Sequence, residues 1–256
     1  THIFEEHLEM GYDYIQLLWT NPTQILPVLC LVSEENQTGK TTFGNFLNAI
    51  FGHNFVAIGQ NELTTEFNGS YASKLIAMVD ESWISYKVID KLKFMATSPS
   101  IMLRQMNKDH MPIDFFCKFI LCSNRVDDFI IANENDERYW VRKIKKFGKF
   151  DPDFLAKLIK EIPYFLHFLS NRELSVPNES RAYFAPARLR TKAFEDLVRH
   201  SKDVLIKEIV ETLLITMERD ELNSIDCTCK DLKDAYFYIR NDITLTKIKE
   251  AIQKEL

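Results

Sequence analysis

The sequence predicts an α/β protein in which helices cover a mostly parallel β-sheet that carries a phosphate-binding loop. In residues 24–150, apolar runs of strand length alternate with segments of helical period, a pattern typical of parallel sheets. A Gly-Lys-Thr sequence lies between the first such run and the first helical segment. Polar residues end two later apolar runs, at the edge of the sheet where ligands gather.

The loop sequence Thr38-Gly39-Lys40-Thr41-Thr42 follows the apolar run of residues 25–32 and precedes a helical pattern in residues 43–51. A helix that begins at the loop favours a polyphosphate there, because its first N–H groups and the positive end of its dipole face the loop. We expect Lys40 to reach the β- and γ-phosphates of ATP and the Thr41 hydroxyl to bind Mg²⁺. The residues expected to contact the nucleotide are Asn36, Gln37, Thr38, Gly39, Lys40, Thr41 and Thr42.

The loop departs from the G-x-x-x-x-G-K-[ST] pattern, because Glu34 stands where the first glycine is expected. Glu34 and Glu35 repel phosphate unless their side chains point away. Asn36 tolerates positive φ better than most residues, so it can supply some of the missing backbone freedom. The alternative is a strand, turn and helix with an incidental lysine.

Two strand ends carry candidate catalytic residues. Asp80 and Glu81 end the apolar run of residues 75–79, where Asp80 can hold Mg²⁺ and Glu81 can polarise the water that attacks the γ-phosphate. Asn124 ends the run of residues 118–124 and can hydrogen-bond the γ-phosphate. The alternative for Asp80 and Glu81 is that they are acidic residues at a strand end that serve only to keep it hydrated. The alternative for Asn124 is an Asx turn.

A β-hairpin is predicted between these strands. Apolar segments 101–106 and 111–116 flank the polar tip Asn107-Lys108-Asp109-His110. Lys108 is either a nucleic-acid contact or an ordinary solvated turn lysine.

Composition limits the function classes. The chain has 256 residues, 46% hydrophobic content and a net charge of −5, so DNA contact requires a local basic patch. Its apolar runs fall short of membrane-spanning length, and we expect no membrane partner. The five scattered cysteines are interpreted as reduced thiols of an intracellular protein, with neither a zinc site nor a Cys/His nucleophile. The start without Met suggests a piece of a longer protein.

These motifs together resemble superfamily 3 helicases, in the subgroup found as the helicase part of phage, plasmid and large-virus primase-helicase (primase-polymerase) proteins. Residues 39–42 resemble the phosphate loop of the family, residues 77–81 resemble its acidic strand end, and residues 119–124 resemble its last strand motif. The DNA-touching hairpin of the family is similar to the segment from Arg104 through Lys108 to His110. The resemblance covers about residues 26–144.

The resemblance implies an AAA+-like P-loop NTPase core with a five-stranded, mostly parallel sheet. It also implies a ring, usually a homo-hexamer, in which ATP and Mg²⁺ lie between neighbouring subunits. Arg138 then falls at the position of the arginine finger, with Arg142 as the reserve. Arg104, Lys108 and His110 become the DNA contacts, and a primase-polymerase domain can belong to the same longer chain.

Outside the core, the sequence is predominantly helical. We expect an N-terminal helix or collar in residues 1–23, the P-loop ATPase core in 24–150, a helical region in 151–224 and a small helical tail in 225–256. The tail is either part of a winged-helix or helix-turn-helix module or a packing appendage.

The leading hypothesis is an ATP-dependent helicase or translocase motor that acts on single-stranded or forked DNA in phage or plasmid replication, in the host cytoplasm. Its catalytic residues are expected to be Lys40, Asp80, Glu81, Asn124 and Arg138, with Thr41 and Asp80 as Mg²⁺ ligands. The first alternative is a nucleotide-dependent, or hydrolysis-deficient, DNA-binding ring or scaffold, which nucleotide titration separates from the motor. The second alternative is a P-loop small-molecule kinase, which phosphotransfer to a small acceptor would support.

Overall fold

The computed structural model describes residues 2–80, 86–127, 129–130, 132–134, 136–148, 151–220, 222, 224–238 and 243–255. The chain divides into two compact units, Thr1–Leu197 and Val198–Leu256. The first unit contains the sheet and every candidate residue named above.

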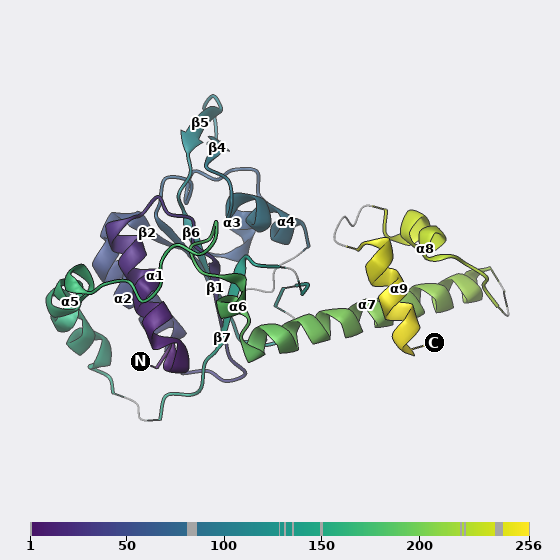
Figure 1. The fold of residues 1–256 in the computed structure, drawn as a ribbon. Coiled ribbons are helices and arrows are strands. Elements are labelled where there is room, and N and C mark those ends of the chain that lie inside the picture. Colours follow the sequence, from purple (N-terminus) through teal and green to yellow (C-terminus); the bar gives the residue numbers. More distant parts are fainter. Residues whose placement is uncertain are drawn as a thin grey trace. The chain divides into compact units, whose positions relative to one another are not determined.

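The centre of the first unit is a five-stranded sheet in which all neighbouring strands are parallel (Figure 1). Its strands are β1 (Val28–Val32), β2 (Phe55–Ile58), β3 (Ile76–Val79), β6 (Lys118–Ser123) and β7 (Tyr139–Lys143). Their spatial order is β2-β3-β6-β1-β7, so the first strand lies between the last two. The predicted α/β class with a parallel five-stranded sheet is confirmed.

Burial explains why these segments form the sheet. All residues of β1, β3 and β6 are buried, so both faces of each strand are covered. A continuous apolar run satisfies such a position better than alternating polar and apolar residues. The edge strand β2 is only partly buried.

Three helices of the first unit pack together: α1 (Leu8–Thr20), α2 (Lys40–Phe51) and α5 (Phe154–Asn171), with α5 in contact with both others (Figure 1). Their apolar side chains share a core with residues from β1, β3, β6 and β7. Trp140 of β7 is fully buried there and stacks on Phe4, with ring centroids 5.3 Å apart. The short 3₁₀ segments Glu5–His7 and Gly52–Asn54 precede α1 and follow α2.

Between β2 and β6 the chain forms α3 (Gln60–Thr64), α4 (Tyr86–Met95) and a hairpin of β4 (Ser100–Leu103) and β5 (Met111–Asp114). β4 and β5 are antiparallel, with Leu103 opposite Met111 across the tip. Figure 1 shows the hairpin projecting beyond the sheet. The predicted hairpin is confirmed.

The chain continues through α6 (Pro186–Leu189) into α7 (Lys192–Arg219). The second unit has its own core, in which residues of α7 pack with α8 (Cys229–Tyr236) and α9 (Leu245–Glu255). A capping box of Thr228 and Asp231 begins α8. Within the described residues, no helix is long and apolar enough to span a bilayer.

Candidate phosphate-binding site

The predicted phosphate loop connects β1 to α2. Gly39 is the N-cap of α2 and adopts a left-handed backbone, with φ of 90°. Gln37 is also left-handed, with φ of 61°, so the positive φ that Asn36 was expected to supply falls on its neighbour. Among the described residues no side chain caps α2. The first N–H groups of this helix therefore lack the partner that a cap supplies and can face an anion.

Lys40 folds back over the loop and reaches the end of the neighbouring strand. Its Nζ donates to Oδ1 of Asn124 at 2.8 Å, to Oγ1 of Thr38 at 3.4 Å and to the Ser33 hydroxyl. The Lys40 residue is 8% exposed. Burial lowers its pKa, and the nearby Cys122 and Asp80 oppose this shift. The ammonium group therefore lies at the mouth of the loop, held by oxygen atoms that a phosphate can replace.

Asn124 lies on the other side of the same space. It follows β6, whose last residue, Ser123, is in register with Val32 at the end of β1. The Asn124 amide also donates to Oδ1 of Asn36 at 3.3 Å. Two predicted site residues that are 84 positions apart, Lys40 and Asn124, thus meet at one edge of the sheet.

Asp80 follows β3, the strand on the far side of β6, and it is exposed. Because its charge acts on both Lys40 and Cys122, its carboxylate lies near the same edge of the sheet. Glu81, the predicted base, lies outside the described residues. The described part of the chain holds no cluster of three or more metal-binding His, Cys, Asp or Glu side chains. A Mg²⁺ ion bound here would take Asp80, the Thr41 hydroxyl and phosphate oxygens, which suits an ion that keeps several waters.

The donor set fits a polyphosphate. One ammonium group, the hydroxyls of Ser33 and Thr38, and an uncapped helix start converge on the loop. The ammonium group and the helix N–H groups can donate to phosphate oxygens, and the helix dipole adds partial positive charge. The Thr38 hydroxyl donates to Ser33 at 3.4 Å and the Ser33 hydroxyl to the carbonyl of Glu35 at 2.8 Å, so these two hydroxyls must turn from the loop to contact phosphate.

Arg138 lies far from this edge in its own chain. Its carbonyl accepts from the N–H of Val28 at the first residue of β1, so it sits at the opposite end of the sheet, about one strand length, or ~16 Å, from the loop. Its side chain is 41% exposed and pairs with Asp136 at 3.2 Å. Asp136 is buried and also binds Lys93 of α4 at 3.0 Å.

Arg142, the reserve arginine, is buried. It forms an ion pair with Glu6 at 2.8 Å and donates to the carbonyl of Phe4 at 3.0 Å. Arg142 therefore fixes the N-terminal segment to β7 and does not fit a role in reaching another subunit.

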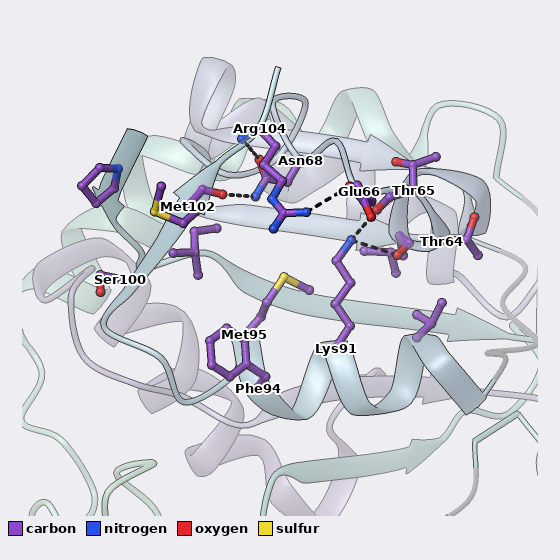
Figure 2. A pocket seen from close by; sticks show the side chains of 14 residues that line it. Thr64, Thr65, Glu66, Asn68, Lys91, Phe94, Met95, Ser100, Met102 and Arg104 are labelled. Atoms are coloured by element: carbon purple, nitrogen blue, oxygen red, sulfur yellow. Dashed lines mark hydrogen bonds and ion pairs between the residues drawn. The ribbon is translucent and has the colours of Figure 1, made fainter. Parts of the chain in front are cut away.

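The three predicted DNA contacts occupy two places on the hairpin. Lys108 and His110 are exposed at the tip, where Asn107 turns the chain with φ of 57°. Arg104 directly follows β4, where the strand enters the tip, and it pairs with Glu66 at 3.1 Å, while its backbone N–H donates to Asn68 (Figure 2).

A cavity of about 650 Å³ lies beside β4, between α4, the hairpin and residues 63–68. Figure 2 shows Lys91 of α4 directed across it, where Nζ donates to the carbonyls of Leu63 at 3.1 Å and Thr65 at 2.7 Å. These carbonyls belong to the last turn of α3, so Lys91 caps that helix.

Sequence reasoning missed the residues at and just after the end of β7 that line the loop. Lys143 pairs with Glu34 at 2.6 Å, and Lys146 lies 3.9 Å from Glu35. The N–H of Phe147 donates to the carbonyl of Gln37 at 3.2 Å. The lysine-rich composition of residues 143–146 was the available signal, but it did not identify the loop as the partner.

The part of the chain that forms the sheet is also the part that matches a known family. A model described as "Family of unknown function (DUF5906)" matches residues 31–142, from β1 into β7. No curated protein matches the chain.

Solved structures share the fold. An apo structure of the NrS-1 C terminal region aligns with a TM-score of 0.66 at 16% identity, over 87% of this chain and 58% of that chain. An A form apo structure of the same region aligns with a TM-score of 0.65 at 16% identity, over 99% of this chain and 64% of that one. The chain is thus similar in fold to the aligned part of the NrS-1 C terminal region, and it spans about three fifths of the length of those solved chains.

Proposed function

We propose that this chain is an ATP-dependent motor domain that binds nucleotide at the loop between β1 and α2 and acts on DNA in replication. The observation that carries the proposal is the 2.8 Å contact between Lys40 and Asn124 beside the N-terminus of α2. This contact brings a cation and an amide from two parallel strand ends to one point, where a γ-phosphate can lie.

Each residue then has a role in ATP hydrolysis. Lys40 exchanges its contacts with Asn124 and Ser33 for the β- and γ-phosphates, and the N–H groups of α2 hold the phosphate oxygens. Thr41 and Asp80 hold Mg²⁺, which neutralises charge on the phosphates. Glu81 orients and polarises the attacking water, and the Asn124 amide, released from Lys40, senses the γ-phosphate.

Arg138 acts between subunits in this proposal. It lies at the opposite end of the strands from the loop of its own chain, and its side chain is partly exposed. A ring, which we take to be a homo-hexamer, would present this arginine to the nucleotide of a neighbour, where such a residue is worth ~10³–10⁵ in rate.

The hairpin is the proposed DNA contact. Lys108 and His110 at its exposed tip can hold the phosphates of single-stranded DNA or of a fork, and Arg104, where β4 enters the tip, can add a further contact. A ring would gather several such tips although the chain as a whole is acidic, with a net charge of −5.

One observation favours a second candidate, a nucleotide-dependent DNA-binding ring that does not hydrolyse ATP. Glu34 stands in the loop in place of glycine, and Lys40 is held by Ser33 and Asn124. Both features oppose productive phosphate binding unless they rearrange.

ATP hydrolysis with and without single-stranded DNA separates the two. The motor predicts hydrolysis that DNA stimulates, loss of hydrolysis in Glu81→Gln, and loss of the stimulation in Lys108→Ala. Lys160→Met, on the exposed face of α5, is the matched control and should behave as wild type. Nucleotide binding without hydrolysis in the wild type would favour the second candidate. Full hydrolysis in Glu81→Gln would refute the assigned base.

A further inference from the structure

The phosphate loop carries two carboxylates where a polyphosphate is expected. Glu34 and Glu35 follow β1 after the buried Ser33 and are both exposed. With Lys40 as its only cation, the loop would have a net charge of −1 before a nucleotide with a charge of about −3 to −4 approaches. Nucleotide binding by this loop, the proposed function on which the following inference rests, requires the chain to offset this charge.

The segment after β7 runs along the loop and fixes it at both ends. The N–H of Ile144 donates to the carbonyl of Val32 at 2.7 Å, where the loop begins. The N–H of Phe147 donates to the carbonyl of Gln37 at 3.2 Å, where the loop nears α2. The two segments are therefore held side by side by backbone contacts and not by side chains alone.

This arrangement places one lysine opposite each glutamate. Lys143 is the last residue of β7 and is in register with Val32, two positions before Glu34. Its Nζ lies 2.6 Å from Oε1 of Glu34, and this hydrogen bond raises the pKa of Lys143. Lys146 lies 3.9 Å from Glu35. Side chains alternate along β7, so Arg142 enters the core while Lys143 reaches the loop.

We propose that Lys143 neutralises Glu34 and so allows a loop that lacks the first glycine to accept the polyphosphate of a nucleoside triphosphate. With Lys143 and Lys146 beside it, the loop region changes from a net charge of −1 to +1. Lys143 is a positioning residue: it acts on the nucleotide through Glu34 by holding that carboxylate toward β7.

The expected effect is moderate, because both side chains of the pair are exposed to solvent: 49% of Lys143 and 68% of Glu34. A unit charge at a distance of about 9 Å from a ligand of charge about −3, with an effective dielectric constant of about 40 to 80 and ~0.1 M salt, changes affinity by roughly three- to sevenfold. The effect should shrink to within about twofold at ~0.5 M salt, where the screening length is about 4 Å.

The test is a calorimetric titration of the whole chain with a non-hydrolysable ATP analogue and Mg²⁺, at low and high salt. The variants are Lys143→Met, Glu34→Gln and the double variant. Lys145→Met is the matched control, because Lys145 is two residues away, 77% exposed, and pairs with Glu5 instead of the loop.

We expect Lys143→Met to bind about three- to sevenfold more weakly than wild type at low salt and Glu34→Gln to bind more tightly by a similar factor. The double variant should return to within about twofold of wild type, and Lys145→Met should stay within the same range.

Wild-type affinity in Lys143→Met would overturn this inference and leave the proposed function intact. A double variant as weak as Lys143→Met would also overturn it, because Lys143 would then act on the nucleotide directly. An equal loss in Lys145→Met would show a general charge effect and refute the specific pairing. A wild type that binds no nucleotide would refute the proposed function itself, and the inference with it.

Discussion

Lys118 makes the stability of the first unit depend on pH in a direction that can be worked from the structure. It is the first residue of β6 and is 5% exposed. Its Nζ donates to the carbonyl of Phe116 at 2.7 Å and to that of Pro22. Burial lowers the pKa of Lys118 from 10.5 to about 8, and the nearby Cys117 only partly opposes this.

The direction in which stability changes with pH follows from the number of protons that Lys118 holds in the folded and unfolded states. Between pH 8 and 10.5 the folded state holds fewer protons at Lys118 than the unfolded state, so the free energy of unfolding rises with pH. The full shift of about 2.5 pKa units corresponds to roughly 3 kcal/mol, of which about 1 kcal/mol falls between pH 8 and 9. From about pH 8 upward the buried thiols oppose the rise, in wild type and Lys118→Met alike, because burial raises the pKa of Cys117 and Cys122 from 9.0 to about 12.

The assay is urea unfolding at pH 8.0, 8.5 and 9.0, followed by tryptophan fluorescence, since all three tryptophans lie in the first unit. The wild type should gain about 1 kcal/mol more across this range than Lys118→Met. The exposed control Lys145→Met should keep the wild-type slope. Equal slopes in wild type and Lys118→Met would refute the assignment of this titration to Lys118.

Three further perturbations test the core, the loop and the proposed ring. Asp13→Asn should destabilise the first unit by about 3–5 kcal/mol in urea unfolding, because fully buried Asp13 pairs with Arg172 at 2.5 Å; a loss below about 1 kcal/mol would contradict this. Gly39→Ala should cost about 1–2 kcal/mol in the same assay from its φ of 90°, since the neighbouring space accepts a methyl group; an unchanged midpoint would contradict the left-handed loop. Glu81→Gln and Arg138→Ala should each lose ATP hydrolysis, whereas their equimolar mixture should regain it at about a quarter of the interfaces of a ring; an inactive mixture would contradict action between subunits.

Much of the fold could be predicted from local patterns. The runs that became β1, β3 and β6 are apolar at almost every position, and such runs fit only strands covered on both faces. The hairpin followed from a polar tip between two apolar segments. The order of strands in the sheet has no local signal, because it depends on contacts between distant segments.

Some contacts of the candidate site could also be predicted from the sequence, and others could not. Lys40 and Asn124 could be brought together from sequence, since the ends of parallel strands meet at one edge. The pairing of Lys143 with Glu34 could not, because these residues are 109 positions apart and only the register of β7 with β1 joins them. The preference for Arg138 over Arg142 came from the family resemblance alone, and the structure adds a physical difference: Arg142 lies within β7 and is buried beside Glu6, whereas Arg138 precedes the strand with a partly exposed side chain.

Nucleotide binding by the loop between β1 and α2 is the central claim, and a calorimetric titration with a non-hydrolysable ATP analogue and Mg²⁺ tests it most directly. We expect one nucleotide per wild-type chain and a loss of about 10- to 100-fold in affinity in Lys40→Met, the range for a lost charge-assisted hydrogen bond. Lys160→Met should bind as wild type. Undiminished binding in Lys40→Met, or no binding in the wild type, would contradict the account.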